Sequence, residues 1–211
     1  MSYIKKIDKP AVAPLTGVSG NALLRTPCGP RRADCIRPGD LVVTRDNGLR
    51  PVQLIWRRSI SLEEIVEKSA NAPVTLNARA VGPMMPQRPL TLAPGHHVLI
   101  PGYQLATEMD QAAGLVEARA LAGTTDAAFH NRDAERETFF NFVFDQHEII
   151  VASGLPVASF LPSGSAVARV DEDTRIELVR RFPELRKKSA TAFPAVRYPK
   201  VPCRDYLPSL A

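Results

Sequence analysis

The sequence has few aromatic residues and few cysteines. Aromatic side chains make up 6% of its 211 residues, and it holds three cysteines. Cys28, Cys35 and Cys203 cannot all pair within one chain and cannot form a four-thiolate zinc cage. A complete disulfide framework is therefore excluded, and a reducing compartment is the default expectation.

Long hydrophobic runs are also missing. No apolar stretch approaches the ~20 residues that a membrane-spanning helix needs. The first ten residues carry several charges where a secretory leader would be apolar. We therefore expect a cytoplasmic protein without a membrane partner, with export by a leaderless route left open.

No stand-alone catalytic motif is present. HExxH, GxSxG, a P-loop and GxGxxG are all absent from the sequence. The net charge is +5 (27 − 22) and the pI is near 9.3, but the basic residues are scattered in pairs and no base-stacking pattern accompanies them. A nucleic-acid-binding domain is a minor alternative, and we expect no cofactor, no bound metal and a protein partner of unknown kind.

Proline, by contrast, is abundant. The chain has 19 prolines and 12 glycines, which favour short elements broken by turns. The β-branched runs between these turns indicate an all-β architecture with a few short helices. The turn at Asp46-Asn47-Gly48 predicts a hairpin between residues 41–44 and 52–56. The other predicted strands cover residues 23–26, 90–92, 97–100, 139–144 and 148–151.

Helical signals are few. Residues 173–182 place apolar side chains at helical spacing, with Glu177 one turn before Arg181 and Pro183 at the expected end. Residues 62–68 and 112–121 are weaker helix candidates. These patterns predict an N-terminal tail at 1–14, a β domain at 15–170, and a C-terminal helix with an extended tail at 171–211. We expect aromatic side chains to hold that tail on the surface: Phe193, Tyr198 and Tyr206.

Four histidines are the obvious candidates for chemistry. His96 and His97 are adjacent, so within a strand they would point to opposite faces and could not chelate one metal together. Asp145 and His147 are two residues apart, which on a strand places them on one face. The pair then either orients the imidazole or belongs to a polar turn that caps a strand.

The cysteines give weaker signals. Cys28 lies in a Pro-Cys-Gly-Pro turn beside Arg31 and Arg32, where it is either a reactive thiol or an exposed thiol of no function. We expect Cys35, between Asp34 and Ile36, to be a small packed residue.

Three segments stand out when they are taken in order along the chain. The first is Gly17-Val-Ser-Gly-Asn-Ala-Leu-Leu-Arg-Thr-Pro, which continues through Ile-Arg-Pro-Gly-Asp40 to Thr-Arg-Asp-Asn-Gly48. The second is Leu92-Ala-Pro-Gly-His-His-Val-Leu-Ile100. The third is Phe144-Asp-Gln-His-Glu-Ile-Ile-Val-Ala-Ser-Gly154. In this order, the three segments resemble the Hint family of hedgehog and intein autoprocessing domains. Together with Arg181-Phe-Pro-Glu-Leu185, which is similar to a bacterial branch of that family, the resemblance covers about residues 14–190.

The resemblance implies a fold and an activity. The fold is a flattened, pseudo-symmetric all-β horseshoe. The activity is self-processing, in which the first residue of the domain attacks the preceding carbonyl in an N–S or N–O acyl shift. By resemblance, His96 is the proton donor to the leaving nitrogen, and Asp145 and His147 have supporting acid–base and orienting roles.

The sequence departs from the family where that chemistry starts. Gly17 occupies the nucleophile position and has no side chain to attack with. Ala93 stands where the family often has the hydroxyl that holds the carbonyl, and Ala158-Ser159 stands where inteins carry His-Asn. Roughly fifteen residues precede Gly17, fewer than the ~50 of a small domain, so we expect no N-terminal partner domain.

The sequence therefore predicts a Hint domain that is catalytically degenerate. Three alternatives remain open at this point. The domain could be a β-rich binding or structural module, it could still turn over through another nucleophile, or it could bind nucleic acid.

Overall fold

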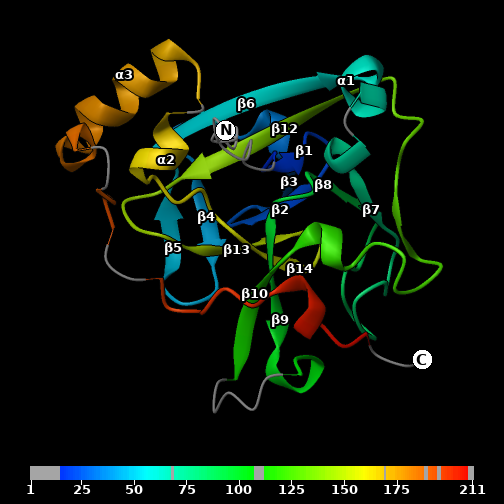
Figure 1. Cartoon of the computed structure of the whole chain (residues 1–211). Coiled ribbons are helices and arrows are strands. Elements are labelled where there is room, and N and C mark those ends of the chain that lie inside the picture. Colours follow the sequence, from blue (N-terminus) through cyan, green and yellow to red (C-terminus); the bar gives the residue numbers. More distant parts are fainter. Residues whose placement is uncertain are drawn as a thin grey trace, which may run out of the picture.

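Two antiparallel sheets form the protein. The structure is a computed structural model that describes residues 15–67, 69–106, 112–168, 170–187, 190–193 and 196–208. The all-β prediction is confirmed (Figure 1). The first sheet has the strand order β11 (Ala128–His130), β7 (Val74–Leu76), β8 (Leu90–Leu92), β1 (Val18–Ser19), β12 (Arg136–Val143), β6 (Leu54–Ser61).

The second sheet carries the remaining strands. Its order is β10 (Ala113–Glu117), β9 (His97–Pro101), β14 (Leu155–Ala158), β13 (Ile149–Ala152), β2 (Leu23–Thr26), β3 (Gly29–Arg32). The hairpin of β4 (Leu41–Thr44) and β5 (Gly48–Pro51) joins this sheet through β13. The main apolar core lies between the two sheets and includes Phe142, Phe144, Leu24 and Leu92, each at most 2% exposed.

Short helices flank the sheets. They are α1 (Leu62–Glu67), α2 (Gly164–Val167) and α3 (Glu172–Arg181). Short 3₁₀ turns cover Ala33–Cys35, Ser69–Asn71, Gly102–Gln104, Ala118–Ala120, Pro183–Arg186 and Cys203–Asp205. No helix in the described residues is long and apolar enough to cross a membrane.

The helix α3 confirms its prediction from the sequence. The side chain of Asp171 caps its start by accepting the Thr174 amide at 2.9 Å, and Glu177 lies 3.6 Å from Arg181. Its Leu178 packs into a second apolar cluster with Trp56 and Phe160. Figure 1 shows α2 and α3 together at one end of β6, with α1 at the other.

Two predicted elements are wrong. Residues 112–121 form β10 and a 3₁₀ turn instead of a helix, because Ala113–Val116 are buried throughout and leave no polar face for a surface helix. The hairpin partner of β4 is residues 48–51 instead of 52–56. The turn is tighter than expected, since Gly48 adopts φ +66° directly opposite Thr44, and residues from 54 onward pair with β12 in the other sheet.

The cysteines and the tail give mixed outcomes. Cys28 is exposed as expected, but Cys35 is also exposed, since the neighbouring Ile36 takes the buried position (2% exposed). In the tail, Phe193 and Tyr206 are buried, and the hydroxyl of Tyr198 donates to Asp46 at 2.8 Å. These three aromatic residues hold the described part of the tail as predicted.

The core position of Phe142 gives a stability test. We expect Phe142→Ala to lower the free energy of unfolding by about 3–5 kcal/mol, because it removes a buried ring of the main core near the end of β12 and leaves a cavity. The matched control is Phe129→Ala on the edge strand β11, where the ring is 42% exposed and the loss should stay below about 1 kcal/mol. Guanidinium unfolding of both variants measures the difference, and equal losses would contradict this packing.

Candidate functional site

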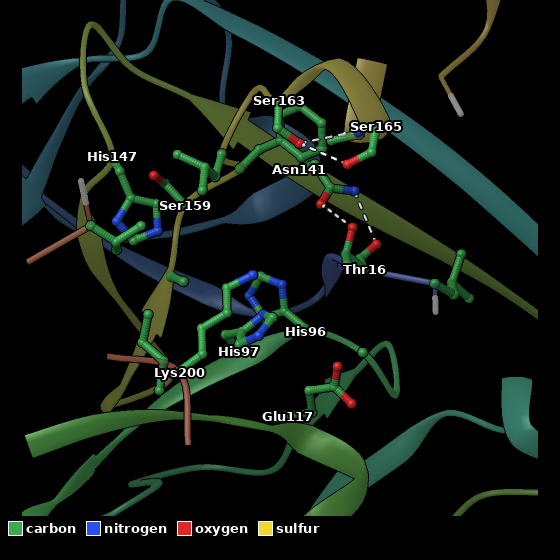
Figure 2. Close-up of a pocket in the computed structure, with 18 of the residues that line it drawn as sticks. Thr16, His96, His97, Glu117, Asn141, His147, Ser159, Ser163, Ser165 and Lys200 are labelled. Carbon is green, nitrogen blue, oxygen red and sulfur yellow. Dashed lines mark hydrogen bonds between the residues drawn. The ribbon is translucent and has the colours of Figure 1, made fainter. Parts of the chain in front are cut away.

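The peptide group between Thr16 and Gly17 is held by side chains at both ends. The Gly17 amide donates a hydrogen bond to Nδ1 of His96 at 3.1 Å. The Thr16 carbonyl oxygen accepts one from Nδ2 of Asn141 at 3.0 Å (Figure 2). A donor on the carbonyl oxygen polarises the carbonyl, so this peptide bond is activated on its oxygen side.

Asn141 was not predicted from the sequence. It lies on β12, is 2% exposed, and also accepts the Thr16 hydroxyl on Oδ1 at 3.0 Å. Asn141 therefore holds the carbonyl in the absence of the family's hydroxyl. Ala93 does lack the hydroxyl and instead donates its backbone amide to the Gly17 carbonyl at 3.0 Å. The available signal was an amide inside the apolar run Phe-Phe-Asn-Phe-Val-Phe, because a buried polar group needs partners.

The protonation of His96 follows from its contacts. Since Nδ1 accepts the Gly17 amide, the proton of the neutral ring is on Nε2. Burial lowers the pKa of His96 to about 3, with smaller contributions from His97 and His147, so the ring is neutral near pH 7. To protonate the Gly17 nitrogen, the ring would first have to gain a proton at Nδ1, which burial disfavours.

His96, His97 and His147 line one cavity of about 280 Å³ beside this peptide group (Figure 2). His96 lies in the turn before β9 and His97 is the first residue of that strand, so strand alternation does not separate them as expected. Burial, with a smaller contribution from the charge of Lys200, lowers the pKa of both His97 and His147 to about 4. The cavity therefore holds neutral imidazoles near pH 7.

Asp145 lies apart from the other predicted site residues. Residues 145–148 form a bend between β12 and β13, so Asp145 and His147 do not share a strand face. The Asp145 side chain is 50% exposed and lies 3.6 Å from Arg50, and it does not line the cavity. The structure thus brings together Gly17, His96 and His147, but not Asp145.

Glu148 fixes the bend that carries His147. Its buried carboxylate accepts two contacts from Asn47 Nδ2, at 2.9 and 3.1 Å, and one from Gln146 at 2.8 Å. Its amide donates to Ser159 Oγ at 2.8 Å. These bonds tie the bend to the β4–β5 turn and to the end of β14, so His147 keeps its place at the cavity.

Gly17 sits in a conformation and a space that suit only glycine. Its φ is +122°, which L side chains rarely adopt. A Cβ atom there would lie 2.8 Å from Asn141 Nδ2, 2.9 Å from Phe139 Cβ and 3.0 Å from the Phe140 carbonyl oxygen. Any larger residue at position 17 must displace β12 or the asparagine that holds the carbonyl.

Sequence and structure comparisons give the family. The Hint domain family matches residues 18–164, which is most of the chain. The chain belongs to the Hint domain family. No curated protein sequence is significantly similar to it.

Solved structures with a similar fold are inteins and an intein-like domain. The bacterial intein-like domain from Clostridium thermocellum shares 12% identity with this Hint domain at a TM-score of 0.46, covering 70% of this chain and 100% of its own. The TvoVMA intein shares 12% identity at a TM-score of 0.42 (68% and 96% covered), and the gp41-1 intein 10% at 0.40 (68% and 98%).

The crowding at Gly17 predicts a difference between two glycines. Gly17→Ala should lower the free energy of unfolding by about 1–3 kcal/mol more than Gly29→Ala. Both sites have positive φ, but a Cβ at Gly29 meets nothing within 4 Å, so only Gly17 adds a steric penalty to the backbone strain. Denaturant midpoints of the two variants measure this. Equal losses would show that position 17 is not crowded.

The lowered imidazole pKa values predict a pH dependence. An unfolded histidine titrates near 6.5, so between about pH 6.5 and 4 the unfolded chain binds protons that the folded one does not. Stability should therefore fall as the pH drops through this window, by up to about 1.4 kcal/mol per pH unit for each histidine fully affected. Proton NMR of the imidazoles should show His96, His97 and His147 still neutral at pH 5, and titration of all three near 6.5 would refute the buried cluster.

Proposed function

We propose that this Hint domain is catalytically degenerate and serves as a non-catalytic binding module. One observation carries the proposal. The Thr16–Gly17 peptide group is hydrogen-bonded by His96 and Asn141, while the residue that would attack its carbonyl is glycine. The family's acyl shift needs a thiol or hydroxyl on that residue, positioned to form a five-membered ring with the preceding carbonyl. Gly17 supplies no such atom.

Neighbouring hydroxyls do not replace the nucleophile. The Thr16 hydroxyl is bonded to Asn141, and attack on its own carbonyl would close a strained four-membered ring. The Ser19 hydroxyl is two residues further along β1 and donates to Asn21 at 2.5 Å. Loss of a catalytic nucleophile costs on the order of 10⁶ in rate, so the polarised bond alone leaves little turnover.

The packing around Gly17 supports a role other than catalysis. Gly17→Cys would supply a thiol, but its Cβ meets the contacts of 2.8–3.0 Å described above. Glycine at position 17 therefore both lacks the nucleophile and fits a space that a larger residue does not fit. A single substitution at this position does not restore an open active site. What remains accessible is the cavity lined by the three histidines.

Inertness is tested with a fusion. A folded carrier protein is joined to the N-terminus of the full chain, incubated with a thiol or hydroxylamine, and examined by intact mass. We expect one species, because no group on residue 17 can take the acyl chain. A catalytically competent Hint domain in the same fusion is the positive control.

A fragment pair cut between Thr16 and Gly17 would contradict the proposal. His96→Ala in the same fusion then shows whether that cut comes from this site. Loss of the cut in His96→Ala would establish an active Hint domain that uses another nucleophile, whereas an unchanged cut would indicate a contaminating protease.

A further inference from the structure

Two of the residues that line the cavity each have a buried hydrogen-bond donor without an acceptor. Nε1 of Trp56 and Nε2 of His96 have no hydrogen-bond partner among the described residues, and the two residues are 8% and 6% exposed. The indole nitrogen is always a donor, and Nε2 of His96 carries the proton because Nδ1 accepts the Gly17 amide. Unpaired buried donors are costly, so both sites favour a ligand with acceptor atoms.

The exposed residue Lys200 lines the same cavity. Residues 199–201 run beside β10, where the Leu115 amide donates to the Pro199 carbonyl and the Val201 amide to the Leu115 carbonyl, both at 2.8 Å. These bonds fix the backbone of Lys200, and Figure 2 shows its side chain extending toward the rings of His96 and His97, with His147 across the cavity. No carboxylate in the described part of the chain forms an ion pair with Lys200.

The rest of the cavity lining is partly polar and partly apolar. Its second cation, Arg58, is already paired with Glu64 at 3.2 Å. Three serine side chains add hydroxyls: Ser159, Ser163 and Ser165. Its one carboxylate among the described lining residues, Glu117, is already paired with Arg119. Apolar side chains complete the wall: Leu115, Ala158, Phe160, Leu161 and Val196. A volume of about 280 Å³ is near the lower limit of small-molecule sites, so the occupant must be small.

We propose that this cavity binds a carboxylate that carries a small apolar group. The carboxylate oxygens accept from Trp56 Nε1 and His96 Nε2 and pair with the ammonium of Lys200, while the apolar part lies against Phe160 and Val196. The inference rests on the proposed function, because the cavity is free for a lasting ligand only if no acyl transfer proceeds beside it. The carboxylate has two sources, a free small acid or the C-terminus of a peptide.

Calorimetry on the full chain with benzoate and benzamide tests the ligand chemistry. The two probes have the same ring and nearly the same shape, and only benzoate has the charge and the two acceptor oxygens. We expect benzoate to bind roughly tenfold more tightly than benzamide. A second arm compares N-acetyl-Gly-Phe with its C-terminal amide, and preferential binding of this free acid over benzoate would identify a peptide C-terminus as the source.

Variants assign the binding to this cavity. Lys200→Met keeps the chain length and removes the charge, and should weaken benzoate roughly tenfold. Trp56→Phe keeps a ring and removes the donor, and should weaken it about fivefold. Lys187→Met removes an exposed lysine outside the cavity and should leave binding unchanged. Circular dichroism establishes that each variant is folded.

The outcomes separate the two proposals. No binding of either acid at about 10 mM, equal binding of acid and amide, or no effect of Lys200→Met overturns the carboxylate site. If the N-terminal fusion stays intact in that case, the degenerate Hint domain stands without this ligand. A fusion that cleaves itself at Gly17 overturns the proposed function whatever the calorimetry shows.

Discussion

The site depends on one peptide group and the two side chains that hold it. His96 accepts its N–H and Asn141 donates to its carbonyl, and the two side chains come from parts of the chain 45 residues apart. These bonds fix Thr16 and Gly17 at the start of β1, between β8 and β12. Because β1 is only two residues long, it forms few backbone hydrogen bonds with its neighbouring strands. The hydrogen bonds from His96 and Asn141 therefore provide much of the positioning of this segment.

Under the proposed function, the same geometry accounts for a site that polarises a bond without breaking it. A Hint domain needs an atom on residue 17 that can reach the preceding carbonyl, and here the backbone at that residue has φ +122° with β12 packed against it. On that proposal, the polarisation by Asn141 and the imidazole at the nitrogen persist without a nucleophile. The cavity beside this peptide group combines neutral imidazoles, two cationic residues (Arg58 and Lys200) and a wall with apolar and hydroxyl side chains, which under the proposed function is suited to binding.

Much of the fold was predicted correctly from local sequence patterns, and the incorrect predictions have physical causes. The β-branched runs at β4 and β13 and the cap and charge pattern of α3 are local signals, so they predicted the elements correctly. Residues 113–117 are mostly small or aliphatic and have weak local preference, and their strand conformation depends on β9 and on the tail beside them. Likewise, the burial of Ile36 in place of Cys35 depends on packing that no neighbouring residue reveals.

The site was predicted only in part for similar reasons. His96 and His147 were identified through the family resemblance, and the cavity brings them together. Asn141 and Glu148 were missed because their partners Thr16 and Asn47 are more than 100 residues away in the sequence and become visible only when the strands are placed. Asp145 was included because its spacing to His147 matters only on a strand, and the chain bends there instead.

Nitrogen NMR of the His96 ring tests the central claim most directly. In protein labelled with ¹⁵N, the account predicts that Nδ1 has the shift of an unprotonated acceptor, that Nε2 carries the proton, and that the Gly17 amide is protected from exchange through its bond to Nδ1. A proton on Nδ1 together with a freely exchanging Gly17 amide would contradict it, because the peptide group would then not be held at its nitrogen.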